Sequence, residues 1–153
     1  MLQKVLGVTL LAVALGGCSQ GASEETQAAA HNALTTWKTK QPAQYSFILT
    51  PTGNHPGSEA LISVENDVVV DVAQPSGAQD DYSKYTMTGV LEETVAASQE
   101  YDRFIAGYDP ELGFLMWYDV PPDHGAGDGV PGYGLSVRCL APSAGVESCA
   151  EFL

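Results

Sequence analysis

Three carboxylates lie among four aromatic side chains in GYDPELGFLMWYDV, residues 107–120, and two more acids follow in the glycine-rich DHGAGDG. Carboxylate oxygens are the ligands that calcium prefers, but calcium takes six or more of them, and the spacing here differs from the alternating acids of the familiar calcium loop. They are therefore weak candidates for a metal site. The candidate ligands are Asp109, Glu111, Asp119, Asp123 and Asp128.

A tight turn explains the DPELG part of this stretch more simply. Asp109 can accept a hydrogen bond from the backbone two residues later, Pro110 fixes its own φ near −65°, and Gly113 can adopt the left-handed conformation that closes a short hairpin loop. The glycines of DHGAGDG likewise favour a loop, in which His124 alone is a poor metal anchor. The sequence favours turn and loop, and no cofactor is expected.

The sequence carries no recognisable catalytic motif. No G-x-S-x-G places a serine nucleophile, and no glycine-rich phosphate loop follows a strand and opens a helix. His31 is expected on a helix, whereas His55 and His124 are expected in loops, so nothing assembles a triad. We expect a protein that is not an enzyme.

Trp117 is the candidate partner-binding residue. In a strand over residues 114–120, successive side chains point to opposite faces, so Trp117 lies on the face opposite Tyr118. If Tyr118 faces the core and the other face of the sheet is open, Trp117 belongs to an exposed apolar patch of the kind that marks docking sites.

The elements that must position these residues follow from periodicity. Ser23 caps a helix that runs to Trp37, alternating apolar residues predict strands, and Asn66-Asp67 predicts a hairpin turn. We expect an α+β fold with an antiparallel sheet and helices packed on one face, and the order of elements suggests two duplicated α-β-β-β units. The predicted strands cover 44–50, 59–65, 67–73, 102–108, 114–120 and 133–140, and the second helix covers 88–101.

The N-terminus predicts a lipoprotein signal peptide. Lys4 precedes an apolar run that is too short to span a bilayer, and Leu15-Gly16-Gly17-Cys18 resembles the lipobox of bacterial lipoproteins. That resemblance implies a diacylglycerol on Cys18. The alternative is an ordinary secretory signal. We expect a signal peptide over 1–17, a tether over 18–24 and a single α+β domain over 25–153.

Charge and cysteines restrict the partners. The formal net charge is −13, with 19 acidic residues against 6 Lys and Arg, so nucleic acid is not an expected partner and anionic lipid would be repelled. The membrane is therefore expected to be reached through the N-terminal lipid alone. Cys139 and Cys149 flank a short segment and predict a disulfide bond in an oxidising compartment.

The chain also resembles an uncharacterised domain family of bacterial secreted and lipid-anchored proteins. The resemblance covers about residues 30–140 and rests on Trp37, on the Tyr45-x-Phe47 strand, on VVVDV and on YDPELGF. It implies an envelope location and the α+β fold, with no agreed activity. Two departures are TPTGNHPG, where many relatives carry cysteines, and Leu115, where proline is common.

The sequence therefore predicts a lipoprotein of the bacterial cell envelope, in the outer membrane and facing the periplasm. Its expected role is that of a non-catalytic binding or accessory module with an envelope protein as partner. The alternative is a calcium- or zinc-binding protein, or a metal-dependent enzyme, that uses the acids between 109 and 128.

Overall fold

The structure, a computed structural model, describes residues 21–75, 80–122 and 132–142, without the side chains of 139, 141 and 142. A helix and three strands are followed by a second helix and three more strands, in the order that the sequence predicts. The elements are α1 (Glu24–Lys40), β1 (Gln44–Gly53), β2 (Ala60–Glu65), β3 (Val68–Ala73), α2 (Met87–Glu100), β4 (Ile105–Tyr108), β5 (Leu115–Val120) and β6 (Tyr133–Pro142).

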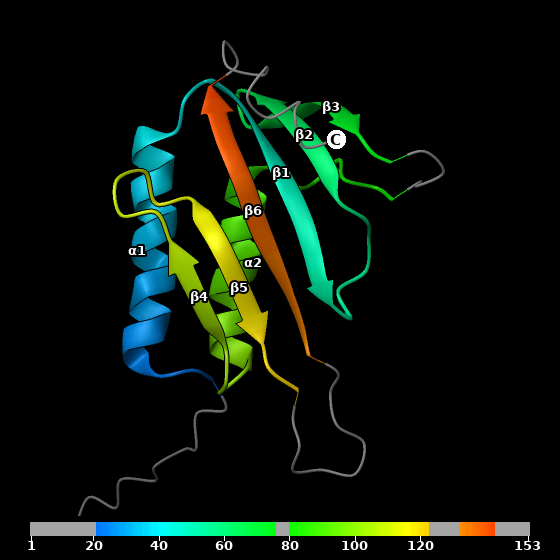
Figure 1. The fold of residues 1–153 in the computed structure, drawn as a ribbon. Helices are drawn as coiled ribbons and strands as arrows, with labels where there is room; N and C mark the ends of the chain where they lie inside the picture. The colour runs from blue at the N-terminus through cyan, green and yellow to red at the C-terminus, as the bar shows by residue number, and fades with distance from the viewer. Residues whose placement is uncertain (1–20, 76–79, 123–131, 143–153) are drawn as a thin grey trace, which may run out of the picture.

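The six strands form one antiparallel sheet in the order β3-β2-β1-β6-β5-β4. Each half of the chain contributes a meander, and the long strands β1 and β6 join the two halves at the centre. Both helices pack against the same face of the sheet, and β3 and β4 are its edges (Figure 1). The α+β prediction is confirmed, while the duplication stays a hypothesis.

Helix α1 begins at the cap that the sequence predicts and extends three residues beyond the predicted Trp37. The Ser23 hydroxyl accepts a hydrogen bond from the amide of Thr26 at 3.3 Å, and the first turn is acidic, which suits the positive end of the helix dipole. The helix ends at Lys40, two residues before Pro42. Ala30, Ala33 and Trp37 form its buried face.

The β2–β3 hairpin turn is the one predicted from Asn66-Asp67. Both residues have positive φ, 49° and 61°, which Asn and Asp tolerate better than most residues. This turn sets the β2–β3 register, in which Glu65 faces Val68.

One core fills the space between the helices and the sheet. Trp37 meets Tyr45 edge to face at 5.1 Å between ring centroids, and the Tyr45 hydroxyl accepts a hydrogen bond from the amide of Met87 at the start of α2. Five aromatic side chains of this core are at most 2% exposed, and Phe114 is partly buried. The five are Trp37, Tyr45, Phe47, Phe104 and Tyr118.

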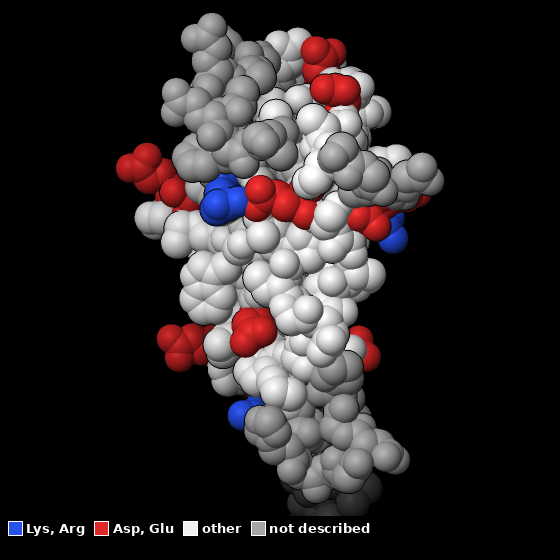
Figure 2. Space-filling view, turned by 45° about the vertical axis from the view of Figure 1, so that its right-hand side comes forward, with Lys and Arg blue, Asp and Glu red and all other residues white. Residues whose placement is uncertain are grey.

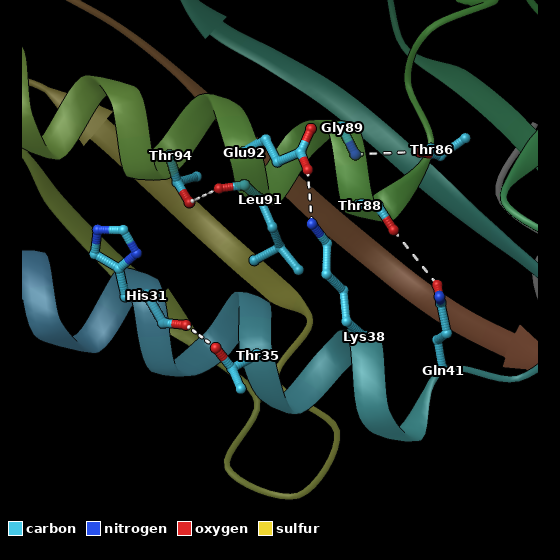
Figure 3. Close-up of polar contacts among 10 residues, drawn as sticks. All are labelled: His31, Thr35, Lys38, Gln41, Thr86, Thr88, Gly89, Leu91, Glu92 and Thr94. Atoms are coloured by element: carbon cyan, nitrogen blue, oxygen red, sulfur yellow. Dashed lines mark hydrogen bonds and ion pairs between the residues drawn. The ribbon is translucent and has the colours of Figure 1, made fainter.

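Polar side chains connect the two helices, through one exposed and one partly buried contact shown in Figure 3. Lys38 forms an ion pair with Glu92 at 2.8 Å, and the Thr88 hydroxyl donates to the side-chain oxygen of Gln41 at 3.4 Å. Within α2, the buried hydroxyl of Thr94 donates to the carbonyl of Leu91 at 2.8 Å. This last bond lets a polar residue lie on the buried face of the helix.

The start of β4 also differs from the sequence prediction. Strand β4 starts at Ile105 instead of residue 102, because residues 101–104 form a turn in which the Phe104 amide donates to the Tyr101 carbonyl at 3.2 Å. Within the described ranges, neither helix combines the length and the apolarity needed to cross a bilayer.

Candidate functional site

The DPELG segment is a tight turn, as predicted. One oxygen of the Asp109 carboxylate accepts hydrogen bonds from the amides of Glu111 at 3.0 Å and Leu112 at 2.7 Å. The Gly113 amide donates to the Asp109 carbonyl at 2.9 Å, and the Asp109 amide donates to the Phe114 carbonyl at 2.9 Å. The Asp109 carboxylate therefore stabilises the turn between β4 and β5.

This turn also docks on α1. Gly113 has φ of +78°, and a Cβ there would lie 2.5 Å from the carbonyl oxygen of Ala33 and 3.0 Å from the amide nitrogen of Trp37. The Lys40 ammonium donates to the carbonyl of Glu111 at 2.7 Å. The turn thus fixes β4 and β5, and with them Trp117, relative to the helix.

The structure does not bring the metal candidates that it describes into one cluster. Glu111 is exposed at the tip of the turn, while Asp119 lies in β5 between its strand partners Ile105 and Gly134. Among residues 21–75, 80–122 and 132–142, no three His, Cys, Asp or Glu side chains are arranged to share an ion. The other two candidates, Asp123 and Asp128, lie outside those ranges, so the metal alternative stays a prediction.

Trp117 lies on the sheet face that is turned away from the helices. Its strand neighbours Tyr118 and Val120 belong to the helix-facing core, whereas Trp117 is 42% exposed. Its indole covers Gly107 on β4, where a Cβ would come within 2.7 Å of the indole nitrogen. Ile105, 48% exposed, lies on the same face as Trp117, and Met116, 40% exposed, lies at an irregularity in the β4–β5 pairing, between Leu115 and Trp117.

A groove of about 410 Å³ adjoins Trp117 at the β4 edge of the sheet. Its lining residues on β4, such as Ile105 and Ala106, lie on both faces of that strand. Trp117 of β5 and residues from the first half of α1 complete the wall. The groove therefore follows the outer edge of β4. It is lined by Glu25, Thr26, Ala29, Ile105, Ala106, Tyr108 and Trp117.

Two acidic side chains lie at or beside the groove. Glu25 is the charged residue in the described lining of the groove, and Asp119 pairs with Ile105 across β4 and β5. Arg103, just before β4, donates to the Pro122 carbonyl at 3.2 Å. Figure 2 shows acidic groups scattered over a largely uncharged face, with few basic groups between them.

A second cluster, not anticipated from the sequence, centres on Glu93 of α2. One oxygen of its carboxylate accepts a hydrogen bond from the hydroxyl of Tyr118, whose side chain is buried, and lies 3.5 Å from Nε2 of His55 in the β1–β2 loop. The other ring nitrogen of His55 lies 2.8 Å from the Pro56 carbonyl. The Tyr133 ring contacts both the His55 and Tyr118 rings, at 6.0 and 6.2 Å between centroids.

The pKa values in this cluster follow from these contacts. Burial acts to raise the pKa of Glu93, but the hydrogen bonds from His55 and Tyr118 outweigh it, and the net pKa is lowered. Burial acts to lower the pKa of His55, but Glu93 and the Pro56 carbonyl outweigh it, and the net pKa is raised. The pKa of Tyr118 is raised by burial and by the neighbouring carboxylate. The pair therefore favours the charged forms of both Glu93 and His55.

The Glu93 cluster ties the β1–β2 loop to α2. Its donors come from the loop and from β5, and both use the same carboxylate oxygen. Because these elements are distant in the sequence, no local spacing of residues predicts the cluster. A glutamate on the core-facing half of α2 beside several tyrosines is the only available signal.

The side chains of the three cysteines lie outside the described part of the chain. Cys139 belongs to β6, but its side chain, like Cys18 and Cys149, falls outside the described part of the chain, so lipidation and the disulfide stay predictions. The family resemblance stays a prediction too. No protein-family model, curated protein or solved structure matches the chain.

Proposed function

We propose that the protein is a lipid-anchored binding module of the bacterial cell envelope, and that the Trp117 surface, formed by Trp117, Ile105 and Met116, receives an envelope protein. The observation that carries the proposal is the 42% exposure of a tryptophan beside a groove, at the edge of a sheet whose other aromatic residues are largely in the core. Exposed tryptophans dominate the binding energy of many interfaces.

A non-catalytic role is part of this proposal. The sequence lacks catalytic motifs, and the carboxylate of Glu93 already accepts from Tyr118 and pairs with His55. These contacts join a loop, a helix and a strand, which supports a structural role for that cluster. Binding is thus assigned to the Trp117 surface, and the Glu93 cluster is assigned to holding the β1–β2 loop.

The anchoring part is tested at Cys18. In cells fed an alkyne-tagged fatty acid, we expect the full-length chain to become labelled and Cys18→Ala to lose the label entirely, because the thiol is the acceptor in the proposed modification. Cys139→Ala is the matched control and should keep the label. Equal labelling of the wild-type chain and Cys18→Ala would refute the anchor at this residue.

The binding part is tested by Trp117→Ala. We expect photo-crosslinking in intact envelopes to return one reproducible partner, and its yield to fall by about tenfold or more in Trp117→Ala, since removing a central aromatic contact commonly costs at least 2 kcal/mol. The protein itself should fold normally because this side chain is exposed.

Val70→Ala is the control for this experiment. Val70 is 54% exposed on β3, at the opposite edge of the sheet, so its truncation removes a comparable exposed apolar group from a surface to which we assign no partner. A partner lost equally in both variants, or retained fully in Trp117→Ala, would contradict the assignment of binding to the Trp117 surface.

A further inference from the structure

β4 is an edge strand with a groove along its free side. Among the residues that the structure describes, it is the last strand in the sheet order and pairs with β5 alone, so alternate residues direct their amide and carbonyl groups away from the sheet. The groove at this edge has its remaining wall on α1, which lies beside β4 in Figure 1. The edge therefore offers main-chain donors and acceptors to a segment lying in the groove.

Both ends of this region are fixed by described contacts. The Asp109–Gly113 turn, held against α1 by Gly113 and by Lys40, follows β4 directly. The turn of residues 101–104 precedes it, and Phe104 anchors that turn in the core. The β4 edge is thus held between two anchored turns, and a preorganised edge lowers the entropy cost of binding.

From this geometry we infer that the Trp117 surface binds an extended polypeptide segment, which pairs with the outer edge of β4 as a seventh strand and carries basic residues between apolar ones. This inference rests on the proposed function and names the chemistry of the partner. The added strand places alternate side chains on opposite faces, one set against Trp117 and Ile105 and the other against the α1 wall.

The negative charge of the protein distinguishes between three candidate occupants of the groove: a second copy of the chain, an anionic membrane surface and a basic segment. Glu25 lines the groove, Asp119 lies beside Ile105, and the chain carries a formal net charge of −13. A second copy of the chain would bring like charges together, and an anionic membrane surface would be repelled. The basic side chains of an extended segment would pair with these carboxylates, and its main chain would form hydrogen bonds with the outer edge of β4.

The test uses the full-length chain purified in non-ionic detergent and a phage-displayed library of random decapeptides. We expect the enriched peptides to alternate apolar and basic residues, and to lose affinity about tenfold or more in Trp117→Ala while Val70→Ala stays within about twofold. Hydrogen exchange should slow at the β4 amides when a synthetic copy of an enriched peptide is added.

N-methylation of the peptide separates strand pairing from other binding modes. Methylating alternate amides removes the donors on one edge of an extended peptide, so one set of methylations should weaken binding about tenfold or more and the complementary set should leave it within about twofold. The methylated peptide that keeps its affinity can then still be used to measure the effect of Trp117→Ala on binding.

Each other result overturns the inference. Trp117-dependent peptides that tolerate both methylation sets would leave the Trp117 surface as a binding site but refute strand addition. Enriched peptides that bind equally to Trp117→Ala, or no enrichment, would refute both the inference and the proposed site. Trp117-dependent binding to phosphatidylcholine vesicles, or dimers in sedimentation that Trp117→Ala dissociates, would assign the groove to lipid or to a second copy.

Discussion

Gly113→Ala is expected to lower the free energy of unfolding by about 2–4 kcal/mol, through positive φ and a clash with the helix backbone. The φ of +78° suits glycine, and the added Cβ would lie 2.5 Å from the Ala33 carbonyl oxygen. Because the obstacle is backbone, it is relieved only if the turn moves away from α1. Urea denaturation followed by tryptophan fluorescence measures the loss, and the melting temperature should fall by roughly 6–15 °C.

Two further variants identify the cause. Glu111→Ala changes an exposed side chain in the same turn, and the hydrogen bond from Lys40 goes to the backbone carbonyl of Glu111, so we expect a change of no more than about 0.5 kcal/mol. Gly113→Asn tolerates positive φ but still carries a Cβ, so it should remain clearly destabilised if the contact with α1 dominates. A Gly113→Ala protein as stable as Glu111→Ala would show that the turn is not held on the helix.

The features that the sequence predicted well depend on neighbouring residues. Ser23 and the acidic first turn cap α1, Asn66-Asp67 makes a hairpin turn and DPELG makes another, because each requires only side-chain and backbone chemistry within a few positions. Period-two alternation places Tyr45 and Phe47 on one face of β1, and both are buried, although Ser46 and Ile48 between and beside them are buried too. Together these local signals determined the α+β class and the order of its elements.

The features that were missed depend on how distant segments meet. That β1 pairs with β6, and so leaves β3 and β4 as edges, is not encoded in any one strand. Trp117 was assigned correctly to the outer face by alternation, but the groove beside it needs the position of α1 relative to β4. The contact between His55 and Glu93 was missed for the same reason, because it joins segments far apart in the chain.

Glu93→Ala is expected to lower the free energy of unfolding by about 2 kcal/mol at pH 5.5, mainly because the buried Tyr118 hydroxyl loses its charged acceptor. The loss should depend on pH. The pKa of Glu93 is lowered from 4.5, so its contribution is present above pH 4.5 and is lost as the pH falls through the folded-state value. The pKa of His55 is raised from 6.5, so its contribution is complete below pH 6.5 and is lost as the pH rises through the folded-state value.

The difference in stability between wild type and Glu93→Ala should therefore be largest between pH 4.5 and 6.5, measured by urea denaturation across the range.

Two further variants separate the contacts of the carboxylate. Glu93→Gln keeps an acceptor for Tyr118 but has no charge, so it isolates the pairing with His55. His55→Gln is the matched control and should remove the decline above pH 6.5 while leaving the acid limb, because Tyr118 still donates to Glu93. Tyr85 and Tyr133, which also lie near the carboxylate, stay neutral through this range, because burial raises the pKa of each from its ordinary value of 10. An identical pH profile for wild type and Glu93→Ala would show that the carboxylate does not hold the loop through His55.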